Sequence, residues 1–216
     1  MTLLQEKDKQ YLKTKFENEL LKPIKILVFV SDESSGFCNE NIEMVKEVAE
    51  LSSLIEWSKH DINDEVAKEY GIKYTPTTIL TDLEGIYQGR IIFQGIPAGY
   101  EFSSFIEGII DVSKRDNNLK EEIKQKLKDL NFPVNIDVYI THACPHCQNA
   151  VMTAHKFAQL NENITAKMID AKEFPELASE HKIFSVPHTY INDKIDFVGA
   201  LPVNEFLDKI FQIRDI

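Results

Sequence analysis

The chain has 216 residues, of which 43% are hydrophobic, which suits one large domain or two small ones. Its formal net charge is −11, and an acidic surface repels phosphate backbones, so nucleic acid is not expected as a partner. No run approaches the ~20 apolar residues that cross a bilayer, and residues 1–23 lack the apolar core of a signal peptide. We therefore expect no membrane contact and a cytoplasmic location.

The first half of the chain predicts alternating helices and strands. Apolar residues from Leu4 to Leu20 mark one face of an opening helix, which Pro23 ends, and residues 24–30 form a continuous apolar run typical of a buried strand. The elements expected next are an amphipathic helix over 42–49, a strand over 54–57, a short helix over 65–70, a hairpin of 77–80 with 86–93 around a turn at 82–85, and an apolar helix over 102–110.

The second half repeats this order. Residues 113–130 are highly charged but keep helical spacing, and we interpret them as the start of a second domain, with the boundary near Asp116. Landmarks then recur in the same order at nearly equal offsets: Cys147 − Cys38 = 109, Pro187 − Pro76 = 111, Gly199 − Gly95 = 104 and Phe206 − Phe102 = 104. The sequence therefore predicts an α/β protein with two copies of one βαβ…ββα unit, residues 1–115 and 116–216. The two glycines are expected at a bulge or at close packing after the last strand of each copy.

The motif CPHC holds two of the three cysteines in the chain. In a reducing compartment a close pair is expected to be catalytic or metal-binding. Cys144 follows a strand and a three-residue loop, and Pro145 suits the first position of a helix, so we expect Cys144 at the N-cap, where a thiolate is stabilised. His146 would lower the pKa of the same thiol further. Cys147 lies one turn on, more buried, and would attack Cys144 after a mixed disulfide has formed.

Pro187 is the second element of the predicted site. It follows Val186 at the entry of a strand, and a proline recurs at the matching place in the first copy. A cis peptide bond here would turn the backbone of Val186 outward beside the dithiol, where it would pair with an extended substrate segment.

These motifs carry a resemblance to a known family. The segments VYITHACPHC, AHKFA and FSVPHTYI, with KILVFV and PAGYEF in the first half, resemble the tandem, glutaredoxin-like protein disulfide oxidoreductases of the thioredoxin superfamily. The resemblance covers nearly the whole chain. It implies two thioredoxin-like units, each with a mixed central sheet flanked by helices, and thiol–disulfide exchange with Cys144 as nucleophile, Cys147 as resolving cysteine and Pro187 facing the substrate.

The sequence departs from this pattern in two places. The first copy reads SGFC, so Ser35 replaces the attacking cysteine and only Cys38 remains, which predicts a redox-silent first unit similar to that of the alkyl hydroperoxide reductase flavoprotein. Thioredoxins also keep a buried carboxylate on the strand before the motif, but Val138 occupies that position here. Asp137 beside it is expected on the opposite face of the sheet, where pairing with a lysine and serving the site through a water are both open, so no role is assigned to it.

Three other interpretations stay open. A zinc site would need ligands beyond Cys144 and Cys147, and without a second tight pair we predict none. A glutathione-dependent glutaredoxin and a non-catalytic tandem interaction module are the alternatives to a protein disulfide oxidoreductase.

No dinucleotide fingerprint is present, so no bound cofactor is expected. The expected partners are protein disulfides or a peroxiredoxin as substrates, and a flavin-dependent enzyme resembling thioredoxin reductase as electron donor.

Overall fold

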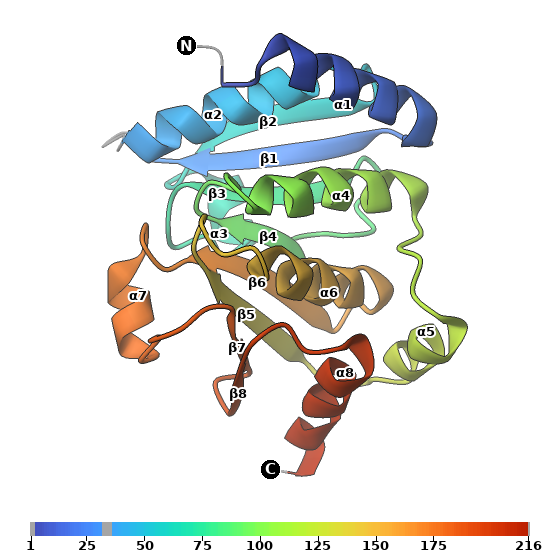
Figure 1. The fold of residues 1–216 in the computed structure, drawn as a ribbon, viewed down its shortest axis with the longest axis vertical. Helices are drawn as coiled ribbons and strands as arrows, with labels where there is room; N and C mark the ends of the chain where they lie inside the picture. The colour runs from blue at the N-terminus through green and yellow to red at the C-terminus, as the bar shows by residue number, and fades with distance from the viewer. Residues whose placement is uncertain (1–2, 32–35, 216) are drawn as a thin grey trace.

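The short apolar runs of the sequence form the strands of one mixed sheet, and the computed structural model describes residues 3–31 and 36–215 (Figure 1). The strands are β1 (Ile24–Val30), β2 (Ile55–Asp61), β3 (Thr77–Asp82), β4 (Ile91–Gln94), β5 (Val134–Ile140), β6 (Ile164–Asp170), β7 (His188–Ile191) and β8 (Ile195–Val198). The helices are α1 (Glu6–Glu19), α2 (Gly36–Ala49), α3 (Glu65–Glu69), α4 (Glu101–Lys114), α5 (Glu121–Lys128), α6 (Cys147–Leu160), α7 (Pro175–Glu180) and α8 (Val203–Gln212), with a final 3₁₀ turn over Ile213–Asp215.

The strand order confirms the internal repeat. The sheet runs β2-β1-β3-β4-β6-β5-β7-β8, so β2-β1-β3-β4 and β6-β5-β7-β8 have the same internal order. In each set the first two strands pair in parallel and the later pairs are antiparallel. Strand β4 then pairs with β6 in parallel, with Phe93 opposite Met168, and this joins the two sets into a single sheet.

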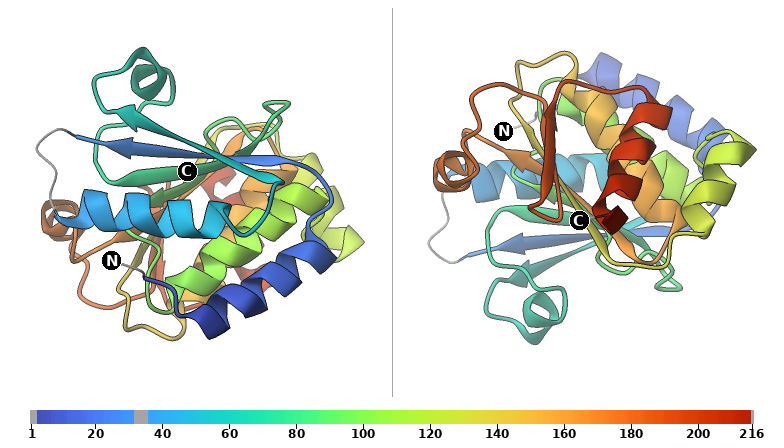
Figure 2. Two further views of the ribbon diagram at one scale, coloured as in Figure 1. Left: turned by 90° about the horizontal axis from the view of Figure 1, so that it is seen from above. Right: turned by 90° about the horizontal axis from the view of Figure 1, so that it is seen from below.

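Helices cover the two faces of the sheet unequally. Helices α1, α2, α4 and α6 lie together over one face, and α3 lies on the other (Figures 1 and 2). Strand β1 shows why a continuous apolar run was needed: Ile26 and Val28 face the large core under the first group of helices, whereas Leu27 and Phe29 pack with Ala67 of α3. Both faces of β1 are therefore buried along most of its length, and Lys25 is its single polar residue.

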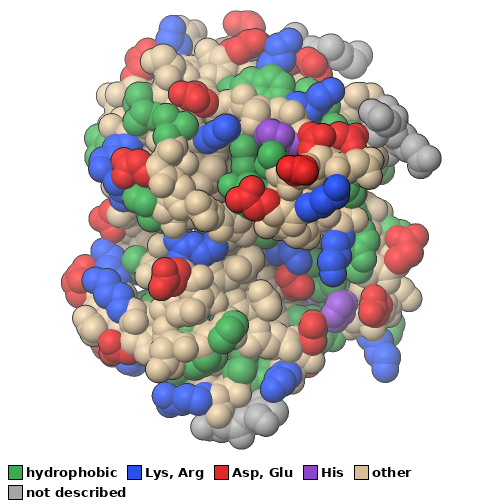
Figure 3. Space-filling model, turned by 180° about the vertical axis from the view of Figure 1, so that it is seen from behind, with side chains coloured by type: hydrophobic (Ala, Val, Ile, Leu, Met, Phe, Trp, Pro, Cys, Tyr) green, Lys and Arg blue, Asp and Glu red, His purple; other side chains and the backbone are tan. Residues whose placement is uncertain are grey.

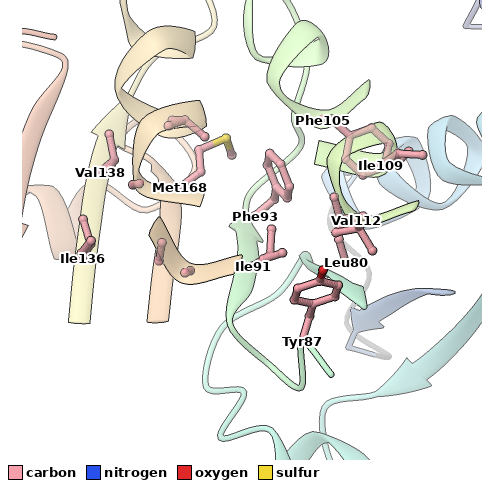
Figure 4. Packing of buried hydrophobic residues seen from close by; sticks show 14 of the residues in the cluster. Leu80, Tyr87, Ile91, Phe93, Phe105, Ile109, Val112, Ile136, Val138 and Met168 are labelled. Carbon is pink, nitrogen blue, oxygen red and sulfur yellow. The ribbon is translucent and has the colours of Figure 1, made fainter. Parts of the chain in front are cut away.

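The core continues without a break across the junction of the two halves. Val138, Met168, Phe93 and Phe105 lie in one row that crosses from β5 through β6 and β4 to α4 (Figure 4). Phe93 and Phe105 meet edge to face with ring centroids 5.4 Å apart. The two halves therefore share one hydrophobic core as well as one sheet.

Two predicted elements differ from the structure. The second strand of the first hairpin begins at Ile91 instead of residue 86, because Asp82 Oδ1 accepts a hydrogen bond from the Ile86 N–H at 2.7 Å and the Arg90 guanidinium donates to the Ile86 carbonyl at 2.5 Å. These bonds hold the residues in between as a wide turn. The charged segment 113–130 is not one helix either: α4 ends with Arg115 in the left-handed region (φ 56°), and α5 begins only at Glu121.

The face turned away from α1, α2, α4 and α6 carries charged side chains of both signs, interspersed with apolar ones (Figure 3). No helix among the described residues is long and apolar enough to cross a membrane.

Candidate active site

The two cysteines of the CPHC motif are joined by a disulfide at the edge of the shared core. Strand β5 leads into a loop that carries Cys144, and Cys147 is the first residue of α6. Their Cα atoms lie 5.5 Å apart. Cys144 is half-buried, whereas Cys147 is 0% exposed and packs in the core. The predicted asymmetry between an accessible and a shielded sulfur is therefore present.

The start of the helix differs from the prediction. Cys144 was expected at the N-cap with Pro145 as the first helical residue, but α6 begins at Cys147 with His146 at its N-cap. The intervening turn is tighter than an α-helix: the Cys147 N–H donates to the Cys144 carbonyl at 3.4 Å and the Asn149 N–H to the His146 carbonyl at 3.2 Å, both three residues apart. Cys144 therefore lies one turn ahead of the helix, so the helix dipole acts on its sulfur less directly than expected.

The peptide bond between Val186 and Pro187 is cis, as predicted, and it lies against the dithiol. Cys144 Sγ is 3.8 Å from the Val186 carbonyl oxygen. Strand β7 begins one residue after the proline. Phe184, two residues before Val186, is 92% exposed. Pro145 and His146 are both exposed.

The first half keeps the scaffold of this arrangement without the dithiol. The Thr75–Pro76 bond is also cis, and Cys38 is buried in α2. Ser35, predicted to replace the attacking cysteine, lies outside the described residues.

Next to the disulfide, the loop of the second half is held by the first half. His142, two residues before Cys144, accepts a hydrogen bond at its carbonyl from the Tyr100 N–H at 3.2 Å. Its Nε2 atom lies 2.8 Å from the Ile96 carbonyl oxygen and 2.7 Å from Asp170 Oδ2. Glu173 Oε1 accepts a hydrogen bond from the Ile96 N–H at 2.9 Å. The connection between β4 and α4 is thus fixed to the loops that follow β5 and β6.

Three carboxyl groups are buried at this junction. Glu101 is 0% exposed, Asp170 is 1% exposed, and the side chain of Glu173 is 3% exposed. Burial raises the pKa of Glu101 to about 7, against a lowering by the Ser104 hydroxyl, and burial also raises the pKa of Glu173 to about 7. The close pairing with Asp170 raises the pKa of His142 above its ordinary value.

The sequence did not reveal this group of buried acids. Val138, the position of the expected buried carboxylate, is an apolar residue with 0% exposure, and Asp137 pairs with Lys167 of β6 at 3.3 Å, which is the first of its two open interpretations. Asp170 ends β6 and Glu173 lies three residues further on, whereas Glu101 begins α4 of the first half, and no local pattern links it to the other two acids. An acid at the buried end of the apolar strand β6 was the only available signal.

Comparisons with known proteins agree with this fold and site. Residues 134–212 match the thioredoxin domain family. The N-terminal domain of the alkyl hydroperoxide reductase protein AhpF of Enterococcus faecalis superposes with a TM-score of 0.87 at 27% identity, covering 96% of this chain and 99% of that one. A protein disulfide oxidoreductase from Aeropyrum pernix gives 0.87 at 27% identity, covering 98% and 94%.

Among curated sequences, the AhpF protein of Staphylococcus epidermidis is 30% identical over 185 residues. These residues are 86% of this chain but 33% of that protein, so the chain spans about a third of the length of such relatives. The chain has a tandem thioredoxin fold with its C-x-x-C motif in the second unit, and its relatives are thioredoxin-fold redox enzymes.

Proposed function

We propose that this tandem thioredoxin-fold protein is a thiol–disulfide oxidoreductase that acts on protein disulfides through Cys144 and Cys147. One observation carries the proposal: an accessible sulfur and a fully buried one form a disulfide beside the Val186 carbonyl, at the entry of β7. A substrate can reach the sulfur of Cys144, whereas the buried sulfur of Cys147 is reached only by Cys144.

The exchange takes two steps. The Cys144 thiolate attacks one sulfur of a substrate disulfide, that S–S bond breaks, and the leaving sulfur departs as a thiolate that takes up a proton. Cys147 then loses its proton and attacks Cys144 Sγ, which breaks the mixed disulfide and releases the second substrate sulfur. The substrate has gained two electrons and the chain holds the Cys144–Cys147 disulfide. An external dithiol or flavin-dependent reductase returns the two electrons.

The neighbouring residues have supporting roles in this proposal. The backbone of Val186, ahead of Pro187, would pair with an extended substrate segment by strand addition, because its carbonyl lies at the reacting sulfur. Pro145 and His146 are exposed within the motif, where they would set the thiol pKa of Cys144. The two units are residues 1–115 and 116–216, and the first is redox-silent.

The proposed partners follow from the relatives. The AhpF proteins belong by their full name to an alkyl hydroperoxide reductase, a peroxide-reducing system, which favours a peroxiredoxin as one substrate of this chain. We propose that a flavin-dependent reductase, resembling thioredoxin reductase, supplies the electrons; the chain covers 36% of the length of such a relative from Pseudomonas putida. A reducing compartment such as the cytoplasm suits a dithiol that must be regenerated.

Turnover by three variants tests the proposal. Reduction of insulin disulfides in the presence of dithiothreitol should be lost in Cys144→Ser, because serine cannot form the mixed disulfide. Cys38→Ala, the matched control in the first unit, should keep the wild-type rate. If Cys144→Ser retains the rate, or if wild type and variant are both inactive, the chain is not an oxidoreductase of this kind.

Trapping tests the direction of attack. Cys147→Ser should accumulate mixed disulfides through Cys144, visible as dithiothreitol-sensitive adducts on non-reducing gels, and Cys144→Ser should accumulate none. Adducts with glutathione alone, and none with protein, would instead support the glutaredoxin alternative.

A further inference from the structure

The buried acids at the junction leave carboxylate oxygens that no hydrogen bond satisfies. Asp170 Oδ2, Glu173 Oε2 and Glu101 Oε1 all lie buried without a well-formed hydrogen bond from the part of the chain that the structure describes. A buried carboxylate oxygen without a donor costs free energy, so three of them beside one another need an explanation. The imidazole of His142 is paired with two of these acids, Asp170 and Glu173.

A single proton on Nε2 of His142 cannot form hydrogen bonds to all the acceptors around it. Nε2 faces two acceptors, the Ile96 carbonyl at 2.8 Å and Asp170 Oδ2 at 2.7 Å, with Glu173 Oε1 at 3.8 Å. A single N–H points at one acceptor only. A cation in place of that proton would accept electron pairs from the imidazole and from both carboxylates at once.

We infer that His142, Asp170 and Glu173 bind a divalent transition-metal cation, with Zn²⁺ as the best match. One ligand atom from each of the three residues lies within 4.8 Å of the others. One imidazole nitrogen and two carboxylate oxygens form a ligand set that zinc accepts, with water in a remaining position. The buried Oδ2 of Asp170 accepts no well-formed hydrogen bond from the described residues but lies 2.7 Å from His142 Nε2, and the side chain of His142 is 34% exposed, which gives the ion a route from solvent.

The surroundings fit a bound ion. The Lys172 N–H donates to Asp170 Oδ1 at 2.8 Å and the Ile96 N–H donates to Glu173 Oε1 at 2.9 Å, so each carboxylate is oriented by the backbone while its other oxygen stays available. The ion would tie the β4–α4 connection of the first unit to the loop that carries Cys144. Its binding is separate from the exchange reaction, so either proposal stands without the other.

Zinc titration of the full chain in its oxidised form tests this site, because the disulfide keeps Cys144 and Cys147 from binding the metal. By calorimetry we expect one zinc per chain and a rise in the midpoint of thermal unfolding. Asp170→Asn, which keeps the shape of the side chain, and His142→Ala should each weaken binding at least tenfold.

His188→Ala is the matched control. His188 Nε2 lies 2.8 Å from Asp196 Oδ2, so this variant removes a histidine–carboxylate pair that has no such third ligand among the described residues. It should bind zinc as tightly as the wild type. Circular dichroism establishes that each variant is folded. The inference is overturned if the oxidised wild type binds no zinc stoichiometrically, or if folded Asp170→Asn binds it unchanged.

Discussion

At the scale of single residues, position 95 requires glycine because buried acids pack against it. It has φ +102°, and a Cβ atom built there would lie 2.9 Å from Asp170 Cβ and 3.3 Å from Glu173 Cδ. Its counterpart in the repeat, Gly199, has φ +98° with nothing within 4 Å. The two glycines share a backbone conformation, but only Gly95 needs the missing side chain for close packing.

This difference predicts unequal costs for one substitution. Gly95→Ala and Gly199→Ala both carry the penalty of a left-handed backbone, about 1–2 kcal/mol. Gly95→Ala should lose about 1–3 kcal/mol more, because buried carboxylates must shift. Urea unfolding of both variants measures this; equal losses would contradict close packing at Gly95.

At the scale of elements, His155 joins α6 of the second unit to β4 of the first. Its Nε2–H donates to the Ile92 carbonyl at 3.1 Å, and its ring meets Phe93 with centroids 4.6 Å apart. Complete burial lowers the pKa of His155 to about 4. The ring is therefore neutral in the folded chain near pH 7.

The lowered pKa of His155 predicts acid sensitivity. The unfolded chain takes up this proton near its ordinary pKa of ~6.5, before the folded chain does, so stability is lost as the pH falls from about 6.5 toward about 4. Between pH 7 and pH 5 the loss should be about 2 kcal/mol larger in wild type than in His155→Gln, measured by urea unfolding. Glu101, Glu173 and Asp111, whose raised pKa values act in the opposite direction, are common to both proteins. Identical pH profiles would mean that His155 is not buried in its neutral form.

The elements also show what could be predicted from the sequence. Strand β1 was predicted to the residue, because a mostly apolar run that is buried on both faces has few alternatives. The start of α6 and the hairpin before β4 were wrong, because turn hydrogen bonds at Cys144 and Asp82 decide them and leave no periodic pattern. The dithiol and Pro187 could be located from their motifs, whereas His142 meets Asp170 and Glu173 through the pairing of β5 with β6, and Glu101 joins them through the pairing of β4 with β6.

At the scale of the whole molecule, the shared sheet predicts cooperative unfolding. Phe93 of β4 and Phe197 of β8 are equivalent in the repeat, but Phe93 is 0% exposed at the centre and Phe197 is 9% exposed on the edge strand. Phe93→Ala should cost about 3–5 kcal/mol, and Phe197→Ala should cost less, because an edge relaxes more readily.

Two probes show whether the units unfold together. The fluorescence of Trp57, the single tryptophan, reports on the first unit, and far-UV circular dichroism reports on both. Their urea transitions should coincide in the wild type and move together in Phe93→Ala. Separate transitions would show that each unit keeps its own core.

The strand order also gives the sheet two edges that could pair with each other: β2 at one edge, called the head, and β8 at the other, called the tail. Strand β2 is the counterpart of β6, and β8 is the counterpart of β4, so the tail of one molecule has the order needed to accept the head of the next. A contact that repeats in this way does not close on itself, and it would build a filament. Edge strand β2 differs from β6 in a way that disfavours such pairing: Lys59 and His60 stand where β6 has Met168 and Ile169. A charged side chain in place of an apolar one on an edge strand opposes edge-to-edge association.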